Sequence, residues 1–444
     1  MMLVNIRKHV MTALLIAAWP AVQAQSAWTL KQCLDTAVVR NKGLLIGRND
    51  LERGRQREQE AKANRLPKLT ANAEYKYFTD MPVQFMPLST FNPMAPEGQF
   101  KEAQFGVPHN INANLQLALP IYDPQLHGAV DMAGQGVDLA GLQYSKTQDE
   151  LFVEVAGLYY NAVVLHHQRA YLDSNLVNAI ALLRNMELLH GQLMATGTDV
   201  GKVRLQRDQL TTRRAQVDSK YQQVLDALKL AIGLPAERPF AIDPEVRFDP
   251  ERTYAGATVA ELELLKHQGY LLNTELRTIR RSGYLPSLRL FASYGTNGFG
   301  YDKAPNEFLT FHPVGFGGLQ LSYPLFGGTV VHRKARQKEL ELRNNELRYA
   351  LLTEQNGVQA QSARREREIA RAFINDRAAQ VVLAGSIYRQ ALLQQQQGTA
   401  SLTDVLLADN VLREAQQEYL DAIIDFLRAD LDLRKHTGNL TTLN

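Results

Sequence analysis

The first predicted elements come from short stretches in which apolar and polar residues alternate. Every second residue from Leu69 to Tyr77 is apolar, and the residues between them are polar or charged. Apolar residues also fill alternate positions over 111–119, 288–294 and 319–323. A period of two is typical of a strand with one apolar face. We therefore predict strands at 68–79, 110–119, 287–295 and 314–323. Residues 79–109 lack this pattern and predict a long loop.

Much longer stretches repeat apolar residues at every seventh position. One row runs from Val130 to Leu193, a second from Val203 to Ala231, and a third from Val405 to Leu433. A sustained seven-residue period is typical of helices packed in a left-handed coiled coil. We predict helical hairpins over 125–232 and 329–436. At a rise of about 1.5 Å per residue, the first helix of each hairpin reaches about 100 Å.

The same short motif stands at the end of two predicted strands. Leu115–Tyr122 reads LQLALPIY, and Leu319–Phe326 reads LQLSYPLF. Proline cannot donate a ladder hydrogen bond, so we expect each motif to mark the change from strand to helix. Prolines also precede the other two strands. The expected junction residues are Pro67, Pro120, Pro286 and Pro324, with Gly327 and Gly328 assisting the bend after the last of them.

The order of helix, strand, loop, strand, proline, long helix and return helix therefore occurs twice. We predict a first repeat over 25–235, a connector over 236–256, a second repeat over 257–438 and a C-terminal tail over 439–444. An internal duplication of this kind constrains the fold more strongly than any single element does.

The N-terminus has the pattern of a secretory signal. Arg7 and Lys8 precede an apolar run from Val10 to Ala18, and Ala24 provides a small residue for cleavage. We predict a signal peptide over 1–24. A membrane anchor is the alternative, but the run is far shorter than the roughly 20 residues that a spanning helix needs. The mature chain is therefore expected outside the cytoplasm.

Composition and motifs give no indication of catalysis or of nucleic-acid binding. The chain is 21% charged with a net charge of +3, which does not suggest a nucleic-acid partner. Cys33 is the single cysteine, so no intrachain disulfide can form. Adjacent histidines at 166 and 167 point in different directions on a helix and form a poor chelate. The glycines from Gly295 to Gly300 lack the following helix of a phosphate loop and predict a flexible outer loop over 296–313. We expect no enzyme activity, no cofactor and no metal.

The two-faced strands suggest a membrane. Strands of about ten residues have the length that a tilted strand needs to cross a bilayer. Four strands cannot close a barrel, because the smallest membrane barrels have about eight. Open strand edges are not viable in lipid. If these strands lie in a membrane, several chains must share one barrel. The alternative is a small sheet whose apolar face packs on a helical bundle.

The duplicated plan resembles the TolC-like outer-membrane efflux proteins over essentially the whole mature chain. The residues that carry this resemblance are Leu285–Leu288 before the third strand, Pro324–Gly328 after the fourth, and the turn with Gly398-Thr399 and Asp404-Val405-Leu406. The resemblance implies a mainly α protein with membrane β-strands, built from the duplicated helix-strand-strand-helix protomer. It implies a homotrimer with a 12-stranded β-barrel continuous with a long periplasmic α-helical coiled-coil barrel.

The resemblance also implies a function and partners. The protein is expected in the outer membrane of a Gram-negative bacterium, extending into the periplasm, as a passive duct for tripartite efflux or type I secretion. A periplasmic adaptor (membrane fusion) protein and an inner-membrane pump of the resistance-nodulation-division or ABC type are the expected partners. The alternative is a periplasmic coiled-coil scaffold without a pore. The strand alternation separates the two, because a pore needs its apolar faces in lipid.

Two acidic residues are the candidates for the periplasmic constriction implied by the resemblance. Asp404 would form a ring of three carboxylates in the trimer, which favours cations. Its alternative role is that of a first-turn carboxylate stabilised by the helix dipole. Asp409 is the second candidate, because Leu407 stands where relatives have an acidic residue. Aligning the seven-residue rows places Lys202 opposite Asp404, so we expect a less acidic constriction than in relatives.

The breaks between the long helices are the candidate contacts for the adaptor. They comprise Thr196, Gly197, Thr198, Gly398, Thr399 and Ser401. We expect Gly197 and Gly398 to allow the chain to reverse at the two turns.

Overall fold

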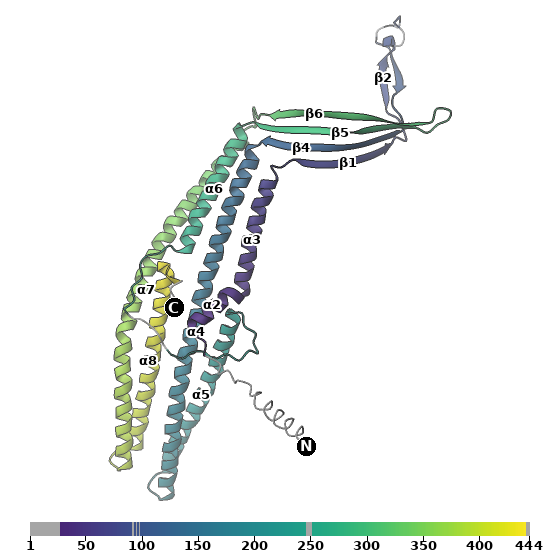
Figure 1. The fold of residues 1–444 in the computed structure, drawn as a ribbon. Coiled ribbons are helices and arrows are strands. Elements are labelled where there is room, and N and C mark those ends of the chain that lie inside the picture. Colours follow the sequence, from purple (N-terminus) through teal and green to yellow (C-terminus); the bar gives the residue numbers. More distant parts are fainter. Residues whose placement is uncertain (1–26, 91–92, 95, 97, 246–250, 441–444) are drawn as a thin grey trace, which may run out of the picture. The chain divides into compact units, whose positions relative to one another are not determined.

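The computed structural model describes residues 27–440 except 91–92, 95, 97 and 246–250 (Figure 1). The predicted signal peptide, part of the connector and most of the C-terminal tail lie outside the described residues. Two very long helices, α4 (Pro124–Gly191) and α7 (Val330–Gln396), are each followed by a return helix, α5 (Gly197–Ala231) and α8 (Leu402–Thr437). Shorter helices are α2 (Leu30–Arg40), α3 (Lys42–Ala63), α6 (Ala260–Tyr284) and the 3-10 turn η1 (Leu88–Thr90).

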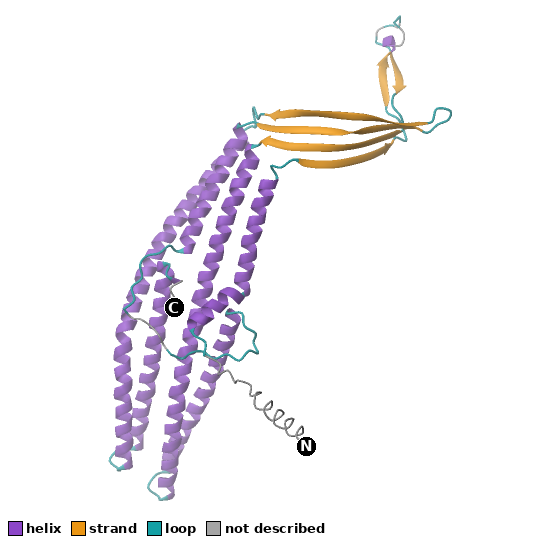
Figure 2. Ribbon diagram, viewed as in Figure 1, coloured by secondary structure: helices purple, strands orange, loops and turns teal. Residues whose placement is uncertain are grey.

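The strands form two sheets (Figure 2). The larger has the order β1-β4-β5-β6, with β1 at Lys68–Tyr77, β4 at His109–Tyr122, β5 at Ser287–Tyr301 and β6 at Phe308–Ser322. All its pairs are antiparallel, and β4 and β5 come from different repeats. The smaller sheet is a hairpin of β2 (Val83–Pro87) and β3 (Phe100–Gln104) within the segment predicted as a loop. The predicted mainly α fold with four two-faced strands is confirmed.

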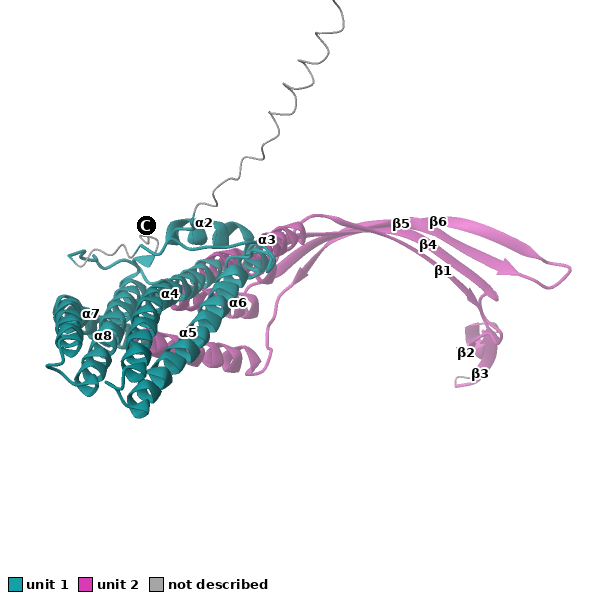
Figure 3. Ribbon diagram, turned by 90° about the horizontal axis from the view of Figure 1, so that it is seen from below, with its two compact units in different colours: residues 1–48, 143–263, 351–444 teal, residues 49–142, 264–350 magenta. Residues whose placement is uncertain are grey.

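The chain divides into two compact units (Figure 3). The first contains residues 1–48, 143–263 and 351–444, and the second contains 49–142 and 264–350. Helices α4 and α7 contribute residues to both. The first unit contains only helices and connecting segments in its described part, and the four-stranded sheet belongs to the second.

The seven-residue rows form the core of the first unit. Met186, Val203, Val405 and Phe426 of these rows are almost fully buried among the coiled helices. Near the chain's beginning, a capping box between Thr29 and Gln32 starts α2, whose buried side packs into the same core. Among the described residues, no helix combines the length and the apolar character needed to cross a bilayer.

The sheet extends further than the alternation predicts. Residues 296–301 and 308–313, expected in a loop, continue β5 and β6, where Gly298 pairs with Phe311. A Cβ atom on Gly298 would lie 2.6 Å from the Phe311 ring, so the ring covers the bare glycine backbone. Aromatic rings placed over cross-strand glycines stabilise sheets in this way. The pattern missed this because glycine carries no polarity signal.

The junction prolines differ in their effect on the strands. β6 ends at Ser322, two residues before Pro324, as expected. β4 instead continues through Pro120 to Tyr122, with a register shift between these two residues. The strand can pass the proline because its other neighbour, β1, pairs only as far as Ala118. A missing N–H is tolerated where a strand has become an edge or contains a bulge.

Candidate functional site

The register of the four-stranded sheet places apolar residues of all strands on one face. Leu69 pairs with Leu117, Leu115 with Tyr294, and Leu288 with Leu321. These side chains are exposed or half-buried, and Leu115 is 49% exposed. The apolar face consists of Leu69, Ala71, Ala73, Tyr75, Leu115, Leu117, Leu288, Leu290, Ala292, Tyr294, Phe311, Leu319 and Leu321. A patch of this extent is not stable in water and requires a cover or an apolar solvent.

The opposite face carries a ladder of amide side chains. Asn72 Nδ2 donates to Asn114 Oδ1 at 3.4 Å, and Asn112 Nδ2 donates to Asn297 Oδ1 at 2.7 Å. Asn114 Nδ2 donates to Asn112 Oδ1 and joins the two pairs. The ladder therefore crosses from β1 through β4 to β5. The amide ladder makes this part of the face polar and suits it to water rather than lipid.

The two outer strands of the sheet keep one side without a strand partner. In the described part of the chain, β1 pairs only with β4, and β6 pairs only with β5. Both edges therefore present unpaired N–H and C=O groups along most of their length. Edges of this kind pair with another chain or must be covered.

Two matching capping boxes begin the return helices. At the start of α5, Thr196 Oγ1 accepts from Asp199 N at 3.2 Å and donates to Asp199 Oδ2 at 2.7 Å. At the start of α8, Ser401 Oγ makes the same two bonds with Asp404, at 3.2 and 2.7 Å. These hydrogen bonds hold the pKa of both carboxyl groups below the usual range of aspartate. Asp404 is exposed to solvent, and the side chain of Asp199 is 28% exposed.

The caps change the predicted comparison of the two tips. Asp199 is the structural counterpart of Asp404, whereas the seven-residue rows had placed Lys202 there. The seven-residue rows and the capping boxes are offset from each other by almost one helical turn. An alignment of the rows therefore does not show that Asp199 corresponds to Asp404. Lys202 Nζ instead lies 3.6 Å from Asp199 Oδ1 on its own helix.

The reversals also differ from the expectation for Gly197. That residue begins α5, and Thr198 follows it in the first turn. The left-handed conformation before α5 is taken by Leu193, with φ at 59°. Gly398 does take that conformation in the second turn, with φ at 74°, and Thr399 Oγ1 donates to Gln394 O at 3.1 Å. Thr196 and Ser401 are the N-caps.

Asp409 lies in a different environment from Asp404. It is only 3% exposed and receives a hydrogen bond from Gln206 Nε2 of α5. Arg413 Nε forms an ion pair with Asp409 Oδ2 at 2.8 Å. Burial raises the pKa of Asp409, and Arg413 and Gln206 oppose that shift. In the single chain this carboxylate joins α5 to α8, and the structure does not bring it together with Asp404.

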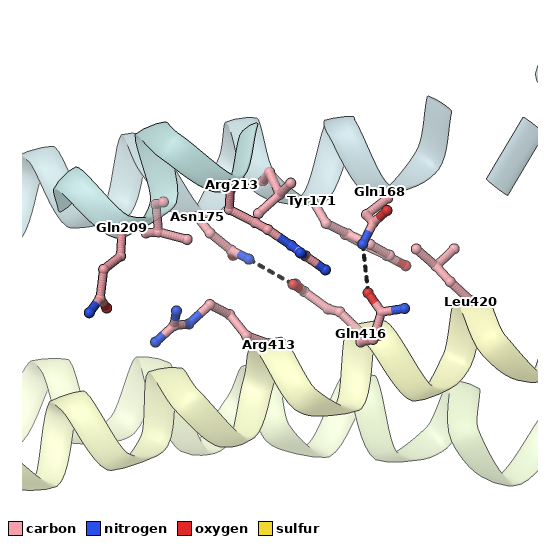
Figure 4. A pocket seen from close by; sticks show the side chains of 11 residues that line it. Gln168, Tyr171, Asn175, Gln209, Arg213, Arg413, Gln416 and Leu420 are labelled. Carbon is pink, nitrogen blue, oxygen red and sulfur yellow. Dashed lines mark hydrogen bonds between the residues drawn. The ribbon is translucent and has the colours of Figure 1, made fainter. Parts of the chain in front are cut away.

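A polar cavity lies between α4, α5 and α8 (Figure 4), with a volume of about 260 Å³. Across it, Asn175 Nδ2 donates to Gln416 Oε1 at 2.8 Å, and Gln168 Nε2 donates to Gln417 Oε1 at 2.7 Å. Arg213 and Arg413 also line it. The sequence contains a signal for this seam, but the apolar rows alone do not show it. Gln168 and Asn175 are seven residues apart, as are Asp409 and Gln416, so polar rows run beside the apolar rows.

The described residues contain no group of three or more side chains that could hold a metal ion. The rings of His166 and His167 lie edge to face with their centroids 5.9 Å apart. His167 Nε2 is 2.9 Å from the carbonyl oxygen of Pro244 in the connector. Burial holds the pKa of His166 below its usual range. These two histidines therefore contribute to packing around the connector.

Solved outer-membrane channels share this fold. The outer-membrane protein VceC from Vibrio cholerae matches with a TM-score of 0.70 and 16% sequence identity, covering 92% of this chain and 96% of the other. The MtrE outer-membrane channel of Neisseria gonorrhoeae matches with a TM-score of 0.70 and 17% identity, covering 93% and 89%. The duplicated protomer with its four-stranded sheet is therefore that of the TolC-like channels.

A curated relative agrees with this fold. The chain is 21% identical to the outer membrane protein TolC of Salmonella enteritidis, over 93% of this chain and 82% of that protein. No family model matches the chain. Fold and sequence together show that the chain is similar to TolC-like outer-membrane channels over most of its length.

Proposed function

We propose that the protein is the exit duct of a tripartite efflux or type I secretion system and works as a homotrimer. One observation carries the proposal, namely the sheet with an exposed apolar face, an opposite face that carries the amide ladder, and two open edges. Three copies that pair β6 of one with β1 of the next would form a closed barrel of about twelve strands, within the range of membrane barrels. Closure satisfies both edges, puts the apolar face in lipid and puts the amide ladder in the lumen.

The long helices of three copies would continue the duct through the periplasm. The polar cavity between α4, α5 and α8 supports a role in opening. Its contacts are amide pairs, and a neutral hydrogen bond contributes only about 0.5–1.5 kcal/mol net because water replaces it when it breaks. Helices joined by such contacts separate at lower cost than helices joined by an apolar seam. Opening is then a two-state shift that an adaptor biases by binding the open state better.

The tips of the two hairpins are the proposed contacts for the adaptor, whose inner-membrane pump supplies the energy. Asp404 is exposed there, its counterpart Asp199 is partly exposed, and the capping boxes fix both side chains. In a trimer they would provide two carboxylates from each chain. This favours cations at the constriction and makes it more acidic than the alignment with Lys202 predicts. Asp409, which is buried, takes no part in this ring.

The test compares substitutions on neighbouring positions of β4 that point to opposite faces. Leu115→Arg places a charge on the apolar face near the middle of the strand, which costs about 2–4 kcal/mol in a membrane barrel. Gln116→Arg places the same charge on the opposite face, which carries the amide ladder. We expect the first variant to reduce the heat-modifiable trimer in outer-membrane fractions and the second to leave it near the wild-type level. Recovery of the wild type and both variants as soluble periplasmic chains would favour the scaffold and contradict the duct.

A further inference from the structure

A small cavity lies in the second unit where β4 changes into α4. Its volume is about 150 Å³, and its walls come from the start of α4 and the last turns of α6. Tyr122, His127 and Asp131 line one side, and Arg277 and Arg281 line the other. All of these residues belong to the same compact unit.

Close packing of α4 on α6 fixes the walls of this cavity. A Cβ atom added to Gly128 would lie 2.1 Å from Thr278 Oγ1, so only glycine permits the contact. Thr278 is buried and donates to Thr274 O at 2.8 Å. Two helices in contact at this point hold the arginines and the start of α4 at a fixed separation.

The two arginines lack a carboxylate partner. Arg277 and Arg281 are one turn apart on α6, and neither forms an ion pair with a carboxylate in the described part of the chain. Arg277 Nη2 donates only to the hydroxyl of Thr274, at 3.2 Å. By contrast, Arg280 on the same helix pairs with Glu339 at 2.6 Å. Two neighbouring guanidinium groups repel each other unless an anion lies between them.

The acidic groups nearby do not neutralise this pair. Asp131 is the single carboxylate among the residues that line the cavity. Asp123 Oδ1 accepts from the backbone N–H groups of Gln125 and Leu126 at 2.8 and 3.3 Å, and so caps α4. His127 Nδ1 is 2.8 Å from Asp123 O, and its ring is tilted by 41° to that of Tyr122, with 5.7 Å between the ring centroids. The cavity therefore retains a net positive charge.

The position of the cavity identifies the anion. It lies beside the last residue of β4 and close to the first residue of β5, where a membrane-spanning sheet leaves the bilayer on its periplasmic side. Tyr122 and Tyr284 are exposed at this level, as expected for an interfacial aromatic belt. Guanidinium pairs bind phosphate oxygens bidentately. We propose that each protomer binds here the phosphate group of a phospholipid from the periplasmic leaflet.

This proposal rests on the proposed placement of the sheet in the outer membrane. Its test is native mass spectrometry of the intact detergent-solubilised trimer with added phosphatidylglycerol. We expect up to one retained lipid per protomer in the wild type. The double variant Arg277→Gln/Arg281→Gln should bind about tenfold to a hundredfold more weakly, the effect of losing charge-assisted hydrogen bonds. Arg280→Gln removes one charge from the same helix and should retain the lipid.

Three results would overturn the proposal. The first is equal lipid retention by the wild type and the double variant. The second is equal loss in the Arg280→Gln control, which would indicate a general charge effect. The third is stabilisation by inorganic phosphate with no retention of phosphatidylglycerol, which would indicate a site for free phosphate. A wild-type trimer that is intact and heat-modifiable but retains no lipid contradicts this inference alone, whereas a wild-type chain that forms no membrane trimer contradicts the proposed function as well.

Discussion

At the scale of single residues, local hydrogen bonding separates aspartates that look alike in the sequence. Asp404 lies in an exposed capping box at the start of α8, Asp409 is buried between two helices, and Asp430 lies in a buried ionic network. Sequence reasoning predicted both roles considered for Asp404 but could not distinguish Asp409, because burial depends on which helix lies opposite. The distinction supports the proposed selectivity role of Asp404 and a stabilising role for the other two residues.

Replacing Asp404 by asparagine should weaken the cation preference of the pore. The substitution removes one exposed carboxylate per chain and keeps a side chain that can cap the helix. We expect the cation-to-anion permeability ratio in planar bilayers to fall about twofold or more. Asp425→Asn, on an exposed position of the same helix, is the matched control. An unchanged ratio in the Asp404 variant would refute its role at the constriction.

The two capping boxes should make the tip sensitive to acid. The pKa of Asp199 and Asp404 is lower in the folded state than the unfolded value of about 3.9. Their contribution to stability is therefore present above about pH 4 and lost as the pH falls through the lower folded values. Amide hydrogen exchange in the first turns of α5 and α8 should accelerate over this range. In the Asp199→Asn/Asp404→Asn variant, hydrogen exchange should accelerate less over the same pH range. An acceleration equal to that of the wild type would show that these two carboxyl groups do not cause the acid sensitivity.

At the scale of elements, one ionic network connects α7, α8 and the connector. Asp430 forms ion pairs with Arg367 at 2.6 Å and with Arg434 at 2.8 Å. Tyr254 Oη donates to Asp430 at 2.9 Å, and its ring lies beneath Arg434 with 5.0 Å between the guanidinium carbon and the ring centroid. Burial and the Asp430 charge raise the pKa of Tyr254 to about 12. The connector is thereby attached to both helices of the second hairpin.

Removing the carboxylate from this network should destabilise the protein strongly. Asp430→Asn removes the carboxylate that pairs with two largely buried arginines, which costs about 3–5 kcal/mol. Tyr254→Phe removes one hydrogen bond to a charged group and costs about 1.5–3 kcal/mol. Asp432→Asn, on the exposed side of α8, should change stability by less than about 0.5 kcal/mol. Thermal and denaturant unfolding would measure the loss of stability in each of the three variants. Equal unfolding midpoints would contradict the predicted order of these losses.

Much of the element plan could be predicted because its signals are periodic. Alternation from Leu69 to Tyr77 predicted β1, and the seven-residue rows predicted the long helices. The outer halves of β5 and β6 could not be predicted, since Gly298 becomes a strand residue only when Phe311 of the neighbouring strand covers it. The amide seam at Asn175 was also missed, because polar rows carry meaning only after the packing of the helices is known.

At the scale of the whole molecule, the central claim is that the face of the sheet with the amide ladder lines a pore and the apolar face meets lipid. The measurement is the conductance of purified trimers in planar bilayers before and after a negatively charged, water-soluble thiol reagent. Gln116→Cys and Leu115→Cys place a thiol on adjacent residues of β4 with opposite orientations. The native Cys33 is buried, and its burial raises the pKa of the thiol to about 12, so it should not react.

We expect the reagent to change the conductance of the Gln116→Cys trimer, because a charged adduct there lies in the lumen. The Leu115→Cys trimer and the wild type should be unaffected. An altered conductance in Leu115→Cys together with an unreactive Gln116→Cys would reverse the assignment of the two faces. The absence of any conductance from the wild-type trimer would contradict the duct itself.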